Sequence, residues 1–121
     1  GVHAIPPNFS VLANERQKSL LQTARLCRDA KTPSIMAGDF NMTPFSPLFG
    51  DILREGGGLQ SAAKGKGLCF TWPSLTFFPL KPLTMQIDHC LVSKGVRILS
   101  WRSGPDLRSD HLPVIVEFSV E

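Results

Sequence analysis

Residues 33–44, PSIMAGDFNMTP, place a short apolar strand directly before a cluster of polar residues. The strand covers residues 34–37, and Gly38, Asp39 and Asn41 lie at its end. Glycine, aspartate and asparagine all favour turns, so the stretch fits a surface turn or an Asx cap. An acid and an amide at the end of a buried strand also fit the rim of an active site. The rest of the chain has to decide between these two interpretations.

The pattern of apolar residues predicts both helices and strands. Two helices are expected, at residues 12–30 and 46–55, the second with Ser46 before Pro47 as its start. Strands are expected at residues 2–5, 34–37, 68–72, 85–93, 96–102 and 112–120, with loops at 77–82 and 104–110. This order predicts an α/β (α+β) fold with one mixed β-sheet and the helices on one of its faces.

Length and composition fit a single domain over residues 1–121, since a chain of this length can bury a sizeable core. The net charge of +3 is compatible with a phosphate-bearing partner but does not require one. No apolar run approaches the roughly 18 residues that span a bilayer. Because the chain starts at Gly1 and not at Met, an upstream segment is expected. The location stays open: the cytoplasm, or outside it if an upstream part carries membrane helices.

The three cysteines, Cys27, Cys69 and Cys90, lack the spacing of a metal site. Their odd number argues against a full disulfide framework. Each is expected to pack as a small buried residue, and Cys90 is expected to be a packing residue and not a nucleophile. His89, beside it, is expected to be a buried histidine whose hydrogen bonds are satisfied.

Polar residues also interrupt or border other predicted strands. His3 lies in the first strand, Asp88 and His89 lie within an apolar run, and Asp110 and His111 precede the last strand. A buried carboxylate needs a partner, because an unpaired buried charge is costly. An imidazole is a suitable partner, since the carboxylate fixes its tautomer and stabilises its protonated form. Two Asp–His pairs are consistent with this pattern, and the residues alone do not choose between them.

Three motifs, GDFN, IDHCLVS and SDHLPVIVEF, together resemble the carboxy-terminal signatures of the endonuclease/exonuclease/phosphatase superfamily, the deoxyribonuclease I-like fold. VHAIPP resembles the strand of that family that carries a histidine before a proline-containing loop. FTWPS resembles the segment that often precedes the Ile-Asp-His strand. The resemblance extends from His3 to Phe118, and several motifs in the right order make it specific for the superfamily.

The resemblance implies a catalytic role for five residues. Asp39 would orient or deprotonate the attacking water, and Asn41 would hydrogen-bond the phosphate as negative charge builds on it. His111 would face the scissile phosphate as a base or as a charged hydrogen-bond donor, and Asp88 would hold His111 in orientation. Adjacent residues of a strand point to opposite faces, so Asp88 is expected to bond His111 and not His89. His3 would lie on the opposite side and assist the leaving group.

The resemblance also implies a divalent cation, Mg²⁺ or Mn²⁺, with Asp110 among its ligands. The family's principal metal ligands, an Asn and a Glu, lie in a first half that this chain lacks. Residues 1–121 are therefore expected to be the carboxy-terminal half of a four-layer α/β/β/α sandwich. Loss of those ligands is expected to impair metal binding and activity in this fragment.

These observations favour a divalent-metal-dependent phosphoesterase that hydrolyses a phosphodiester or phosphomonoester with activated water. Nucleic acid, a phospholipid or another small phosphate ester are all open as substrates. The alternative is a non-catalytic binding or scaffold module with the same fold. An upstream sequence with a Glu and an Asn at strand ends would favour the enzyme. Because two helices cover only one sheet face, a homodimer that packs sheet against sheet is also expected.

Overall fold

A mixed sheet of four strands forms the centre of the molecule, in the order β1-β2-β4-β3. Its middle is the antiparallel pair of β2 (Ile35–Asp39) and β4 (Asp88–Val92). β1 (Val2–His3) pairs in parallel with β2, and β3 (Gln60–Ser61) pairs antiparallel with β4. The computed structural model describes residues 2–3, 10–74 and 84–121, with side chains from residue 13 onward in these ranges.

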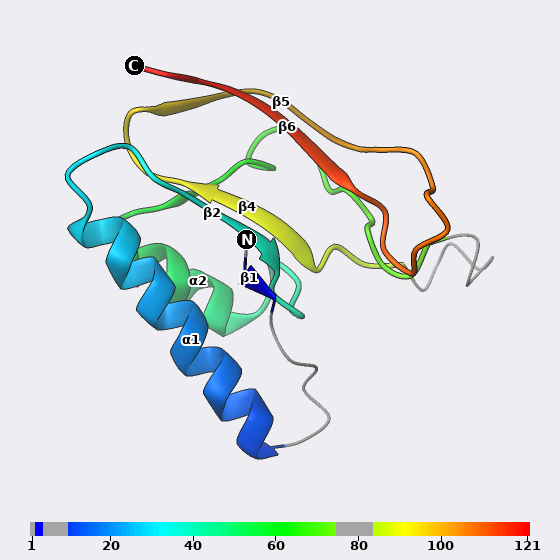
Figure 1. Ribbon diagram of the computed structural model, residues 1–121, viewed down its shortest axis with the longest axis horizontal. Coiled ribbons are helices and arrows are strands. Elements are labelled where there is room, and N and C mark those ends of the chain that lie inside the picture. Colours follow the sequence, from blue (N-terminus) through cyan, green and yellow to red (C-terminus); the bar gives the residue numbers. More distant parts are fainter. Residues whose placement is uncertain (1, 4–9, 75–83) are drawn as a thin grey trace.

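Two helices, α1 (Ser10–Asp29) and α2 (Pro47–Glu55), lie together on one face of this sheet (Figure 1). Residues alternate between the two faces of a strand, and one of these faces packs with the helices into an apolar core. The buried residues of this core are Leu20, Ala24, Met36, Phe40, Met42, Phe49, Ile52, Leu59 and Leu91. α2 begins at Pro47 as expected, and Gly57 and Gly58 close its end with φ of 76° and 85°.

The opposite face of the sheet is covered by an antiparallel hairpin of β5 (Val96–Ser103) and β6 (Val114–Val120) (Figure 1). A second apolar cluster joins the hairpin to the sheet, with Trp101 from β5 and Cys90 and Val92 from β4. The molecule therefore has three layers: helices, the four-stranded sheet and the two-stranded sheet.

The expected α+β class, with helices on one face of a mixed sheet, is confirmed, but the last two strands do not extend that sheet. The reason is that β2 and β3 already occupy both edges of β4, so the strand that follows β4 cannot pair with it. The turn at Gly95, with φ of 95°, instead carries the chain across the sheet face. The face opposite the helices is thus partly covered, and not fully exposed as the sequence suggested.

Several predicted strands are shorter in the structure than in the sequence pattern. Residues 68–72 contribute a single bridge, between Trp72 and Met85, and the strand predicted at 85–93 starts at Asp88. β3 was not predicted, because two residues carry no periodic signal. The rest of the first predicted strand and the loop at 77–82 lie outside the described residues.

Of the three cysteines, only Cys90 is buried as expected. All three cysteines are free, with Cys90 buried and Cys27 and Cys69 half-buried. Among the described helices, none is both long and apolar enough to cross a membrane.

Candidate active site at the ends of β2 and β4

Two carboxylates face each other at one end of the central strand pair. Asp39 is the last residue of β2, Asp88 is the first of β4, and the two are direct partners in the antiparallel register. Both lie two residues from positions that face the hairpin, Ala37 and Cys90, so both point to the hairpin side of the sheet. The alternation of side chains along each strand thus brings two acids together at one edge.

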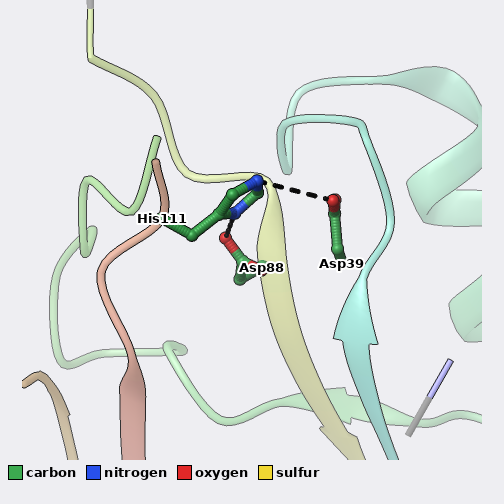
Figure 2. A group of neighbouring side chains, drawn as sticks. All are labelled: Asp39, Asp88 and His111. Carbon is green, nitrogen blue, oxygen red and sulfur yellow. Dashed lines mark hydrogen bonds and ion pairs between the residues drawn. The ribbon is translucent and has the colours of Figure 1, made fainter. Parts of the chain in front are cut away.

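His111 completes this group from the segment before β6. Its Nδ1 lies 2.8 Å from Asp88 Oδ2, and its Nε2 lies 3.8 Å from Asp39 Oδ2 (Figure 2). A carboxylate can only accept, so Nδ1 donates to Asp88, and in the neutral imidazole Nε2 carries the free lone pair. The side chains of His111, Asp88 and Asp39 are 27%, 20% and 12% exposed, so the group is accessible at its edge. The expected bond between Asp88 and His111 is confirmed.

Residues 71–74, whose two end residues are buried, hold the His111 segment against β4. The carbonyl of Thr71 accepts from the Leu112 N–H at 2.8 Å, and the Ser74 hydroxyl donates to the Ser109 carbonyl at 2.5 Å. The Thr71 hydroxyl oxygen also lies 3.4 Å from the backbone nitrogen of Asp88. Thr71 and Ser74 are fully buried. The sequence pointed to FTWPS only through its resemblance to a family segment. The feature that indicates these bonds is a hydroxyl residue on each side of the Trp-Pro pair.

The GDFN stretch is both a turn and a border of this group. The backbone N–H of Asn41 donates to Asp39 Oδ1 at 2.7 Å, which is the bond of an Asx turn. Asn41 has a φ of 51°, in the left-handed region that asparagine tolerates better than most residues. Because Oδ1 is held by this turn, Oδ2 of Asp39 is the oxygen that faces His111. GDFN therefore forms the expected turn, and it also borders the Asp39, Asp88 and His111 group.

Two other predicted site residues, His3 and Asp110, are not part of the Asp39, Asp88 and His111 group as the structure describes it. The backbone of His3 pairs with Asp39 in the β1–β2 ladder, but its side chain is outside the described residues. Asp110 is exposed, and its carboxylate lies 3.4 Å from the Ser109 hydroxyl. Among the described residues, the acids and histidines whose ligand atoms come within 4.8 Å of one another are Asp39, Asp88 and His111. Asp110 does not belong to this group.

This group does not by itself form a complete Mg²⁺ site. Mg²⁺ prefers six oxygen ligands in octahedral geometry. Asp39 and Asp88 supply carboxylate oxygens, but Oδ2 of Asp88 is already bonded to His111. Further oxygens from outside the group would be needed to hold the ion.

An apolar cleft of about 650 Å³ opens between the sheet and the hairpin, beside the carboxylate–histidine group. Asp88 and His111 contribute to its lining, and the remainder is mostly apolar, including Ile35, Val116 and Phe118. The group therefore lies in a concave region of the molecule, which is typical of ligand sites.

His89 lies on the other face of β4 and does not contact this group. It is 2% exposed, and its Nε2 lies 2.7 Å from the carbonyl oxygen of Met42. Burial lowers the pKa of His89 below its ordinary value, so the neutral form is favoured. The expectation of a buried, hydrogen-bonded histidine is confirmed.

The fold of this chain is similar to that of several solved structures. A crystal structure of an endonuclease/exonuclease/phosphatase from Bacteroides vulgatus matches with a TM-score of 0.76 and 22% identity over 89% of this chain and 45% of that chain. A second, from Beutenbergia cavernae, matches with 0.69 and 22% over 98% of this chain and 34% of that one. A mannosyl-6-phosphatase from Bacteroides thetaiotaomicron matches with 0.56 and 21% over 88% and 46%. The chain thus spans less than half the length of these proteins.

A search of curated proteins found no match. The model of the Endonuclease/Exonuclease/phosphatase family matches residues 2–111, which is most of the chain and contains every residue of the site. The family match, the shared fold and the order of the GDFN, IDH and SDH motifs agree with one another. We conclude that this chain belongs to the endonuclease/exonuclease/phosphatase family.

Proposed function

We propose that the chain is the carboxy-terminal half of a divalent-metal-dependent phosphoesterase, which hydrolyses a phosphodiester or phosphomonoester with activated water. The observation that supports this most is the contact of His111 with Asp88 and its approach to Asp39, at the ends of two neighbouring strands. A carboxylate-oriented imidazole beside a second carboxylate is suited to moving a proton on or off a water.

The distances allow one water to lie between Asp39 and His111. Oδ2 of Asp39 and Nε2 of His111 are 3.8 Å apart, too far for a direct hydrogen bond. A water oxygen about 2.8 Å from each atom would hydrogen-bond both. In this proposal Asp39 orients or deprotonates that water. His111, held by Asp88, acts as a base or, when protonated, as a hydrogen-bond donor to the phosphate.

Three further residues take proposed roles around this pair. The Asn41 side chain would hydrogen-bond a phosphate oxygen as negative charge builds there. His3 would assist the leaving group, and Asp110 would contribute a carboxylate to the cation. Mg²⁺ or Mn²⁺, when bound, would polarise a phosphoryl oxygen and stabilise the negative charge of the leaving oxygen. Water, substrate oxygens or further protein ligands would complete its coordination.

The substrate class is wide in this proposal: nucleic acid, a phospholipid or a small phosphate ester. We include phosphomonoesters because one protein of similar fold is a mannosyl-6-phosphatase. The cleft beside His111 supplies apolar contacts and few charges, so it does not favour a nucleic acid backbone.

The experiment is a hydrolysis assay on a polypeptide that joins this sequence to its upstream coding sequence. Release of p-nitrophenol from the mono- and bis-p-nitrophenyl phosphates would be followed with and without Mg²⁺. Mg²⁺-dependent turnover that His111→Ala abolishes would support the enzyme. Absence of turnover, together with an upstream sequence that lacks the Glu and Asn at strand ends, would favour the alternative, a non-catalytic binding or scaffold module.

We also propose that the isolated chain forms a homodimer through the sheet face that carries the cleft. The hairpin covers part of this face but leaves apolar side chains exposed along it, including Phe118 at 45% and Ile35 at 39%. Contact between two such faces would remove this apolar surface from water, and a symmetric contact would close the assembly.

A further inference from the structure

Three hydrogen bonds link the buried His89 ring, through Gln86 and directly, to the backbone of Cys69 and Met42. The Cys69 N–H donates to Gln86 Oε1 at 3.0 Å, and Gln86 Nε2 lies 3.3 Å from His89 Nδ1. His89 Nε2 lies 2.7 Å from the Met42 carbonyl oxygen. Because a carbonyl can only accept, Nε2 carries the proton, and Nδ1 of the neutral ring then accepts from Gln86. The three bonds therefore form one consistent chain across three separate segments.

The side chains of this network are fixed by burial and by packing. His89 and Gln86 are each 2% exposed. The His89 ring lies between two phenylalanines, with centroid distances of 5.2 Å to Phe40 and 4.7 Å to Phe49. A buried network in which every group has a partner is rigid, and removal of one member leaves costly unpaired groups.

The network ends on the turn that carries Asp39. Met42 directly follows Asn41, whose φ of 51° lies in the left-handed region. On one side of Asn41, its N–H is bonded to the Asp39 carboxylate, and on the other side the Met42 carbonyl is bonded to His89. The bond from His89 therefore supports this turn at Met42, beside the backbone bond from the Phe40 N–H to the Ile87 carbonyl at 2.9 Å.

We propose that His89, supported by Gln86, is a positioning residue that holds the Asp39–Asn41 turn, and with it the Asp39 carboxylate, in place against His111. Adjacent residues of β4 then serve both sides of the site: Asp88 holds His111 on the hairpin face, and His89 holds the Asp39 turn on the helix face. The catalytic meaning of this role rests on the proposed function, but the positioning itself does not.

Amide hydrogen exchange of the 121-residue chain, followed by NMR, tests the positioning without any substrate. The reporter is the Asn41 amide, and the control is the Ala62 amide, which bonds the Cys90 carbonyl at 2.8 Å in the other apolar cluster. His89→Phe keeps an aromatic ring but removes the donor, so Asn41 should exchange roughly tenfold faster while Ala62 is unchanged. His89→Gln keeps an N–H that can reach Met42, so most of the Asn41 protection should return.

Two results would overturn the proposal. One is unchanged Asn41 exchange in His89→Phe, and the other is an equal loss of protection at Asn41 and Ala62 that His89→Gln does not reverse. If His89→Phe does not fold, Gln86→Leu takes its place, since it keeps His89 itself but removes the donor to His89 Nδ1, together with the acceptor of the Cys69 N–H. Faster amide exchange at Asn41 but not at Ala62 would then support the proposal, and unchanged exchange at Asn41 would contradict it. Absence of phosphoesterase activity would affect neither outcome.

Discussion

Asp39 and Asp88 are direct partners across β2 and β4, and both carboxylates point to the same face of the sheet. Like charges opposite one another in a sheet repel. The His111 imidazole lies beside both acids, and it donates a hydrogen bond to Asp88. The site therefore joins two acids that are unfavourable neighbours through one histidine from a distant segment.

Removal of this histidine should weaken the fold. In His111→Ala, the Asp88 carboxylate loses its donor while it still faces Asp39, so we expect the free energy of unfolding to fall by about 1–2 kcal/mol. Urea unfolding of the 121-residue chain measures the change. His111→Asn is the matched variant, because its amide can still donate to Asp88, and it should retain most of the stability. Equal stability of His111→Ala and the unaltered chain would contradict this prediction.

Asp88 should matter for turnover in a longer, active protein that contains this chain. We expect Asp88→Asn to lower kcat by roughly 10²-fold or more, because an orienting carboxylate supports proton transfer by the imidazole. Steady-state hydrolysis of a nitrophenyl phosphate measures the change. Asp51→Asn is the control, since Asp51 is a half-exposed carboxylate of α2 that pairs with Arg54. Similar rates for the two variants would argue against the assigned role of Asp88.

The isolated chain should have weak or no phosphatase and nuclease activity with Mg²⁺. The Asp39, Asp88 and His111 group offers only two carboxylates to the ion, so we expect weak metal binding and poor stabilisation of the phosphoryl charge. The measurement is turnover of mono- and diester substrates by purified protein, with Asp39→Ala as the control for contamination. Robust turnover that Asp39→Ala removes would show that this chain is sufficient.

Stability should decline in mild acid because of His89. Burial lowers its pKa in the folded chain below 6.5, so below that pH the unfolded chain binds more protons than the folded one. The free energy of unfolding is then highest above about pH 6.5 and falls as the pH drops toward the folded-state pKa, with a limiting slope of about 1.4 kcal/mol per pH unit.

Urea unfolding between about pH 7.5 and pH 5 measures this decline, and other titrating groups contribute to it. The difference between the unaltered chain and His89→Gln isolates the contribution of His89, because glutamine does not titrate. Parallel pH profiles for the two proteins would rule out His89 as the cause.

Self-association should depend on the cleft face. Light scattering of the 13.3 kDa chain is expected to give the mass of a dimer, and Phe118→Ser should shift it toward the monomer. Leu26→Ser is the control, since Leu26 is an exposed apolar residue of α1, 67% accessible, outside the cleft. A monomer at high concentration that binds no hydrophobic dye would refute the dimer.

The helices were the most predictable part of the fold. Apolar periodicity together with Ser46, Pro47 and the glycines after Glu55 marked α2 to within one residue. The separate hairpin was not predictable, because the apolar pattern of residues 96–102 and 112–120 is the same whether the strands extend a sheet or pack across it. That choice depends on which edges of β4 are already occupied, and this is a property of the tertiary structure.

The candidate site was predictable where the chemistry depends on alternation along a strand. The opposite directions of Asp88 and His89 followed from period two, and their different surroundings agree with it. The supporting roles of Thr71 and Ser74 could not be read from the sequence, since they bond backbone atoms of segments far along the chain. Asp110 had a motif but lies outside the Asp39, Asp88 and His111 group.

The two-sided burial of β4 has a consequence for how the strand finds its place. Cys90, Leu91 and Val92 are all buried, because helices cover one face of the sheet and the hairpin covers the other. Three apolar residues buried on both faces would tolerate a slip of one residue, since either face accepts them. Asp88 and His89 would not tolerate it, because the slip would turn the carboxylate into the phenylalanine-lined core and the imidazole out of it. Asp88 and His89 therefore also fix the register in which β4 pairs with its neighbours.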